Sequence, residues 1–250
     1  MTLRLRGEAG ARVTMAAMTR SSRAGSAVFA ISLLTVGIAP GLAVAAPGVG
    51  QTAPARWGDC ERFVSDTYLP TAQCTTVPVP IDDANPAGPQ ANLAVIKIPA
   101  RGDRIGVLMM NPGGPGASAV DSVVNLADRL ADSPIAERFD LVAFDPRGVG
   151  HSTPELRCLS DAEQDACRQE SMVDYSPAGV ARIEDLNRTM AGKCVERMGK
   201  EFLGSVGTAS TAKDMDAVRE ALGEDTINYL GYSYGTQLGT AYVEQFPNRV

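Results

Sequence analysis

Apolar residues in this chain follow an alternation of strand-like and helix-like patterns. Strand-like runs occupy residues 105–110, 139–145 and 226–230. Helical spacing of apolar residues occupies 120–131, 177–199, 211–222 and 236–246. The first two strand-like runs are almost continuously apolar, as expected of strands buried on both faces of a sheet. The alternation predicts an α/β fold, with a mostly parallel sheet covered by helices on both faces.

The region before these runs predicts a two-stranded start to the sheet. Residues 76–81 contain two prolines and predict an edge strand, because proline cannot donate a hydrogen bond to a neighbouring strand. Residues 92–98 predict its hairpin partner, after a turn at 82–89. Residues 155–176 show no regular pattern.

The helical patterns also predict caps and buried positions. Thr211 is the expected N-cap of the third helix and Gly223 its C-cap. In the long helix at 177–199, one apolar stripe is expected to face the core; its members are Val180, Ile183, Leu186, Met190 and Val195.

The N-terminus predicts a targeting segment. Arg20 and Arg23 precede an apolar stretch at 27–39, and Ala43-Val44-Ala45 supplies small residues typical of a signal-peptidase site. We therefore expect residues 1–45 to be a signal peptide and the protein to be secreted or held in the cell envelope, without stable membrane insertion after cleavage. The alternative is an uncleaved membrane anchor, for which the stretch is short.

After the signal, the chain divides into two expected parts. Residues 46–75 form a lead-in, rich in Pro and Gly at first and then bounded by cysteines, and residues 76–250 form the α/β portion. Removing residues 1–45 changes the formal net charge from -6 to -10. An acidic mature surface argues against a nucleic-acid partner.

Five cysteines follow the predicted signal, so an exported protein could oxidise them. We expect Cys60 to pair with Cys74 and Cys158 with Cys194, which leaves Cys167 as a free thiol. A metal site is not expected, because the chain has a single His and no Cys-x-x-Cys pair.

The sequence Gly231-Tyr232-Ser233-Tyr234-Gly235 lies between a predicted strand and a predicted helix. Gly-x-Ser-x-Gly in this context is the signature of a nucleophile elbow, a tight turn that exposes the Ser hydroxyl above a sheet. Ser233 is therefore the candidate nucleophile, and the backbone N–H of Tyr234 is a candidate oxyanion donor. The alternative is an ordinary turn that contains glycines.

A second glycine-rich loop, at residues 111–118, follows the first buried strand. Its glycines free the backbone to aim N–H groups at one point, as an acyl-transfer enzyme needs for the negative oxygen of its tetrahedral intermediate. Gly114 is the preferred donor, with Gly113 next. The alternative is a Pro/Gly turn before a helix.

The third loop, at residues 145–152, follows the second buried strand. We expect it to have a structural role, with Arg147 paired to Asp145. A contribution to the shape of the site is the alternative. All three loops are predicted at the carboxyl ends of strands, where open parallel sheets bind their ligands.

Together these motifs resemble the secreted tripeptidyl aminopeptidases of actinobacteria, which belong with the prolyl-aminopeptidase-like α/β-hydrolases. The quoted residues are Asn111-Pro112-Gly113-Gly114-Pro115-Gly116, residues 145–152, and Gly231 to Thr236. The resemblance implies an α/β-hydrolase fold, Ser233 as nucleophile, no cofactor, and the N-terminus of a peptide or protein as substrate.

One departure from that family concerns the catalytic triad, which the family orders as Ser, Asp, His. The seventeen residues after Ser233 include neither Asp nor His, and the single His, His151, belongs to the 145–152 turn. We therefore expect this chain to be the N-terminal part of a longer serine hydrolase, without its later strands and cap and inactive alone. The alternatives are an esterase or lipase of the same fold and a non-catalytic remnant or binding module.

Overall fold

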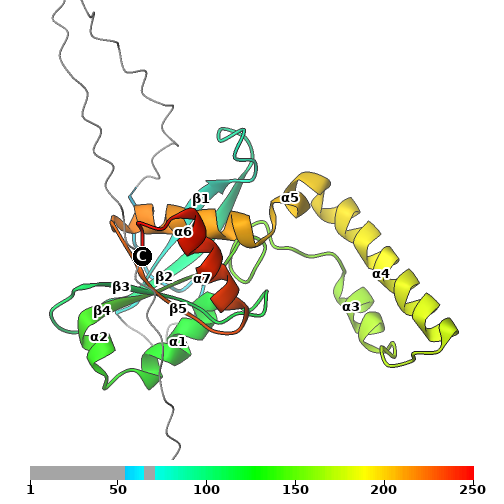
Figure 1. Cartoon of the computed structure of the whole chain (residues 1–250), viewed down its shortest axis with the longest axis horizontal. Helices are drawn as coiled ribbons and strands as arrows, with labels where there is room; N and C mark the ends of the chain where they lie inside the picture. Colours follow the sequence, from blue (N-terminus) through cyan, green and yellow to red (C-terminus); the bar gives the residue numbers. More distant parts are fainter. Residues whose placement is uncertain (1–53, 65–70) are drawn as a thin grey trace, which may run out of the picture. The chain divides into compact units, whose positions relative to one another are not determined.

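A computed structural model describes residues 54–64 and 71–250 of the chain (Figure 1). The predicted signal peptide and residues 46–53 of the lead-in lie outside the described residues. The strands are β1 (Gln73–Pro80), β2 (Gln90–Ile98), β3 (Gly106–Asn111), β4 (Phe139–Phe144) and β5 (Asn228–Gly231). The helices are α1 (Ala119–Arg129), α2 (Pro134–Arg138), α3 (Asp161–Arg168), α4 (Pro177–Met198), α5 (Lys200–Ser205), α6 (Thr208–Leu222) and α7 (Tyr234–Gln245).

The five strands form one mixed sheet in the order β1-β2-β4-β3-β5. β1 pairs antiparallel with β2, and β2 pairs antiparallel with β4. β3 lies parallel to both β4 and β5. The predicted hairpin and edge strand are confirmed, since β1 has β2 as its one sheet partner among the described strands. Because β3, β4 and β5 run in the same direction, the loops that follow them lie at one end of the sheet.

Helices cover both faces of the sheet, as the alternating pattern predicts (Figure 1). On one face, α6 and α7 bury apolar side chains against β2, β3 and β4; Met215, Leu238 and Tyr242 are fully enclosed there. On the other face, α1 packs Val120 and Val123 against the sheet. Two separate apolar cores therefore hold the strands that carry the three glycine-containing loops.

The α3–α4 region differs from the prediction in two ways. Residues 155–176 contain α3, whose start is capped by Ser160 through a capping box with Glu163. The predicted buried stripe of α4 is wrong, because Val180, Met190 and Val195 are each about 40% exposed. Neither α3 nor α4 contributes a side chain to the two apolar cores.

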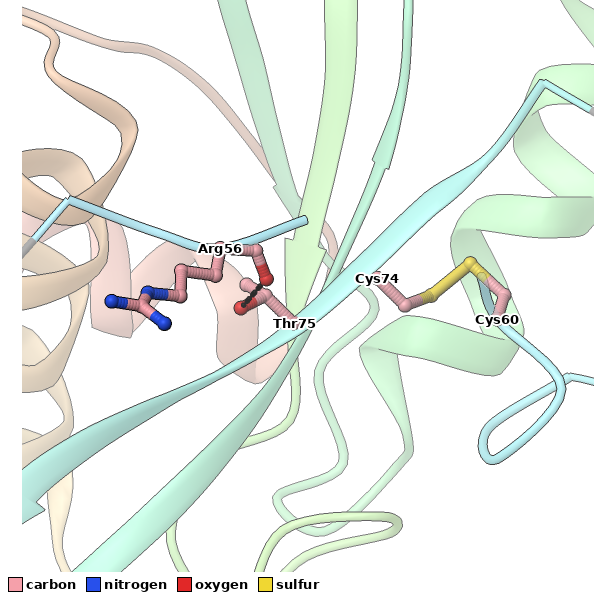
Figure 2. The surroundings of a disulfide bond; sticks show 4 residues. All are labelled: Arg56, Cys60, Cys74 and Thr75. Atoms are coloured by element: carbon pink, nitrogen blue, oxygen red, sulfur yellow. Dashed lines mark hydrogen bonds between the residues drawn. A yellow bond between two sulfur atoms is a disulfide. The ribbon is translucent and has the colours of Figure 1, made fainter. Parts of the chain in front are cut away.

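Both predicted disulfides are present. Cys60 pairs with Cys74 at the start of β1, beside a hydrogen bond of 2.9 Å from the Thr75 hydroxyl to the Arg56 carbonyl (Figure 2). Cys158 pairs with Cys194 and joins the segment before α3 to α4. Cys167 is a free thiol, as expected.

Two predicted features of α6 have different outcomes. The helix begins at Thr208 after Gly207, so Thr211 lies inside the helix and the predicted N-cap is wrong. The Thr211 hydroxyl instead donates a hydrogen bond to the Gly207 carbonyl within the first turn. Gly223 is the C-cap in the left-handed conformation, as predicted. Within residues 54–64 and 71–250, no helix is long and apolar enough to cross a membrane.

Candidate active site

Ser233 occupies a strained turn between the end of β5 and the start of α7. Its backbone has φ 51° and ψ -124°, and it is the one non-glycine residue with positive φ in the described part of the chain. Such a conformation costs roughly 1–3 kcal/mol and persists where the surrounding structure enforces it. Ser233 is also exposed, so the turn presents its hydroxyl to solvent.

Close backbone packing holds this turn and explains both of its flanking glycines. A Cβ at Gly231 would lie 2.5 Å from the Gly235 carbonyl oxygen, and a Cβ at Gly235 would lie 2.6 Å from the Asn111 carbonyl oxygen. Both separations are too short for any side chain. The Gly235 N–H donates to the Tyr232 carbonyl at 2.7 Å, and the Tyr229 hydroxyl donates to the Gly235 carbonyl at 2.9 Å.

The 111–118 loop lies directly against Ser233. A Cβ at Gly113 would lie 2.9 Å from the Ser233 Cβ and 3.0 Å from the Tyr234 nitrogen. Gly113 also has φ +97°, which favours glycine. The structure therefore brings together the predicted nucleophile and the predicted oxyanion loop, although about 120 residues separate them along the chain.

The backbone amides near Ser233 differ in whether they are already bonded. The Gly113 N–H is buried and donates to the Asn111 side-chain oxygen at 2.9 Å. Gly114 is exposed, and its N–H donates no hydrogen bond within the described ranges, which is also true of the Tyr234 N–H. Gly114 and Tyr234 thus keep free donors, whereas the Gly113 N–H is occupied.

Asp145 organises the third loop. Its buried carboxylate accepts hydrogen bonds from the Ala119 N–H at 2.7 Å and the Val120 N–H at 3.1 Å, at the N-terminus of α1. It also accepts hydrogen bonds from the Ser118 hydroxyl at 3.1 Å and from the backbone N–H of His151 at 2.8 Å. The carboxylate therefore joins the end of the 111–118 loop to the 145–152 turn, and it lies where the helix dipole favours negative charge.

The predicted pairing of Arg147 with Asp145 is wrong. Arg147 makes a bidentate ion pair with Asp214 of α6, at 2.8 Å from its Nε and 2.5 Å from a terminal nitrogen, and both side chains are buried. The turn points Arg147 toward α6, while Asp145 faces α1. The structural role expected for this loop agrees with both sets of contacts.

His151 lies in the 145–152 turn and faces α1. Its Nε2 is 2.9 Å from a carboxylate oxygen of Asp121, and its ring packs near Phe63 with centroids 5.7 Å apart. Across the described ranges, the Ser233 hydroxyl forms no hydrogen bond with His151 or with any other side chain.

The sequence did not predict the contacts that three buried polar residues make around this site. Asn111 contacts both the loop and the elbow, Asp145 joins two loops, and Asp214 holds Arg147. Asn111 and Asp145 each come at the end of a predicted strand, and this position could have identified them as candidate site residues. Asp214 gave no such signal, because its partner lies 67 residues away.

A cavity of about 530 Å³ opens elsewhere, beside β1 and the N-terminal segment. Trp57, Phe63 and Thr75 are among its lining residues, and none of the four candidate site residues lines it. The Lys97 ammonium lies 4.1 Å from the centroid of the Trp57 ring, in a cation–π contact. This cavity is separate from the exposed turn at Ser233.

Comparison with known proteins shows extensive similarity to hydrolases. Residues 106–250 match the family described as the alpha/beta hydrolase fold. The chain is 56% identical over 220 residues to carboxylesterase B of Mycobacterium tuberculosis, covering 83% of this chain and 42% of the relative. It is 47% identical over 230 residues to serine protease Hip1 of the same species, covering 90% and 44%. It is 41% identical over 217 residues to tripeptidyl aminopeptidase of Streptomyces lividans, covering 85% and 39%.

The chain therefore spans less than half the length of each of these three relatives. Their names include an esterase, a protease and an aminopeptidase. The residues that match the family, 106–250, contain the elbow and the 111–118 loop.

Proposed function

Because this chain belongs to the alpha/beta hydrolase fold family, we propose that it supplies the nucleophile and the oxyanion donors of an exported serine hydrolase. The proposal rests chiefly on the strained, exposed conformation of Ser233 at the start of α7. A non-glycine residue held at positive φ between a strand and a helix is the geometry of a nucleophile elbow.

The proposed reaction begins with attack of the Ser233 oxygen on a substrate carbonyl carbon, while a base takes the hydroxyl proton. The carbonyl oxygen becomes negative and is held by the free N–H groups of Tyr234 and Gly114. Collapse of this intermediate breaks the bond to the leaving amine, which receives the proton, and leaves an acyl group on Ser233. Water then attacks the acyl carbon and releases the acid.

The base is the part of this mechanism that we assign to a polypeptide segment outside the 250 residues. His151 is bonded to Asp121, and the Ser233 hydroxyl has no side-chain hydrogen-bond partner in the described ranges. A Ser hydroxyl without a base is a weak nucleophile. The relatives are more than twice as long as the aligned part of this chain.

For the substrate, we propose the N-terminal part of a peptide or protein. Two of the three relatives carry the names of a protease and of a tripeptidyl aminopeptidase. Ester hydrolysis is the second candidate, because the relative with 56% identity is named a carboxylesterase. Neither substrate requires a cofactor in this mechanism.

A fluorophosphonate probe tests the nucleophile assignment. We expect the probe to label the 250-residue chain negligibly. A second protein, the extended product, continues this chain through an open reading frame that encodes an Asp and a His after codon 250. In the extended product we expect labelling at Ser233. Ser233→Ala should abolish labelling of the extended product. Labelling at another residue would overturn the role of Ser233, and strong labelling of the 250-residue chain would overturn the external base.

Substrate class and export need separate measurements. A tripeptide p-nitroanilide and a p-nitrophenyl butyrate, offered to the extended product, compare peptide with ester cleavage; a higher kcat/KM for the ester would favour the esterase.

Mass spectrometry of protein from the culture medium or cell envelope tests export, with a new N-terminus expected after Ala45. An intact N-terminus would instead support an uncleaved anchor.

A further inference from the structure

Asn111, the first residue of the 111–118 loop, forms hydrogen bonds with both the rest of that loop and the elbow. Its side-chain oxygen accepts from the Gly113 N–H at 2.9 Å, and its backbone carbonyl accepts from the Tyr232 N–H at 3.0 Å. It pairs with Gly231 in the parallel β3–β5 ladder. Asn111 is 4% exposed, so neither bond competes with bulk water.

The segment that Asn111 holds has little rigidity of its own. Gly113 and Gly114 both have positive φ, at 97° and 107°. Glycine has access to more backbone conformations than any other residue, so two in succession allow the intervening peptide plane to rotate. A side-chain acceptor on the N–H two residues ahead removes part of that freedom by closing a local turn.

On the other side, Asn111 touches the turn that contains Ser233. Its carbonyl oxygen is so close to Gly235 that a Cβ there would lie 2.6 Å from it. The same carbonyl accepts the Tyr232 N–H immediately before the nucleophile. The relative placement of the Gly114 and Tyr234 amides is therefore linked through one buried side chain and its own backbone.

We propose that Asn111 is a positioning residue, which sets the direction of the Gly114 N–H relative to the Tyr234 N–H and so pre-organises the oxyanion site. This inference rests on the proposed hydrolase function for its catalytic consequence. Asn111 does not touch substrate in this account. By bonding the Gly113 N–H, its side chain also leaves Gly114 as the loop's donor.

The test compares Asn111→Ser with Asn111→Ala. The two replacements differ by one oxygen atom and leave similar space, but Ser can accept the N–H two residues ahead and Ala cannot. Asn125→Ala serves as the control, because Asn125 is exposed on α1 and its side chain bonds only the Asp121 carbonyl.

In kinetic assays of the extended product, we expect Asn111→Ala to lower kcat about 10- to 100-fold with KM changed less than about twofold, since loss of a whole oxyanion donor costs about 10²–10³ in kcat. The kcat of Asn111→Ser should be at least about fivefold higher than that of Asn111→Ala, and the kcat of Asn125→Ala should match that of the wild type. Equal losses in the Ser and Ala variants, or a loss confined to KM, would overturn the proposal.

Amide hydrogen exchange of the 250-residue chain gives a second readout that does not depend on activity. The Gly113 amide should exchange at least about tenfold faster in Asn111→Ala than in wild type, with slower exchange restored in Asn111→Ser. If no form of the protein hydrolyses ester or peptide, the proposed function fails, and exchange alone decides whether Asn111 orders the loop. Unchanged Gly113 exchange in Asn111→Ala would overturn the positioning role.

Discussion

The sheet body and the α3–α4 region use similar sequence patterns with opposite results. In the sheet body, α1 places Val120 and Val123 fully inside a core against the strands. In α4, apolar residues at helical spacing leave Val180 and Met190 about 40% exposed. Helical periodicity thus identifies which residues share a face, but burial of that face depends on a packing partner from elsewhere in the chain.

The bonds that hold the two regions also differ. The loops of the sheet body are tied by buried polar groups such as Asp145 and the Arg147–Asp214 pair. The α3–α4 region is tied by the Cys158–Cys194 disulfide and by exposed or half-exposed ion pairs around Glu163. Buried bonds are sensitive to the loss of one partner, whereas exposed ion pairs contribute little.

The largest expected difference comes from two arginine substitutions. Arg147→Met should lower the free energy of unfolding by about 3–5 kcal/mol, because it leaves the buried Asp214 carboxylate without its partner. Arg188→Met, which removes an exposed pair with Asp185 in α4, should change it by less than about 0.5 kcal/mol. Urea unfolding of both variants measures the contrast, and similar midpoints would contradict it.

Removing the disulfides comes next. The Cys158–Cys194 bridge spans 36 residues and the Cys60–Cys74 bridge spans 14. The chain-entropy relation gives contributions of about 4 and about 3 kcal/mol. For Cys158→Ser with Cys194→Ser, faster amide exchange should be confined to α3 and α4, since these helices contribute nothing to the two apolar cores. Faster exchange throughout β2 and β3 would show that the regions unfold together.

Two glycine-to-alanine changes should act in opposite directions. Gly113→Ala places a methyl group 2.5 Å from the Tyr232 carbonyl oxygen at positive φ, so a loss of roughly 1–3 kcal/mol is expected. Gly192→Ala lies inside α4 with open space around the new methyl, and should add about 0.5–1 kcal/mol of helix stability. Thermal melts of both variants give the comparison, and a stabilising Gly113→Ala would contradict the close approach to the elbow.

The smallest effect concerns pH in the α3–α4 region. Hydrogen bonds from Lys193, and then from the Ser160 backbone and Arg197, hold the pKa of Glu163 well below its ordinary value of 4.5. Because the pKa of Glu163 is lower in the folded protein, its contacts stabilise the fold fully above the pKa of the unfolded chain. This stabilisation is lost as pH falls through the folded pKa. A carbon NMR titration of the Glu163 carboxyl should show ionisation persisting well below pH 4.5. A midpoint near 4.5 would contradict these contacts.

Local sequence determined much of this protein. Gly231 and Gly235 around Ser233 specified a turn that only glycine can flank, and the glycines at 113, 114 and 116 specified the loop that meets it. All five strands and the two disulfide pairs also followed from pattern and spacing within short stretches. These features depend on backbone conformation and local periodicity, which neighbouring residues control.

Only the tertiary structure decided which distant groups meet. In that structure Arg147 pairs with Asp214 instead of Asp145, the apolar stripe of α4 stays exposed, and Asn111 lies between the loop and the elbow. The physical reason is that a charge or an apolar face shows its type in the sequence, but its partner is set by how sheet and helices pack. At Ser233 the two levels meet, since the motif predicts the turn and the packing of Asn111 and Gly113 against it builds the surrounding site.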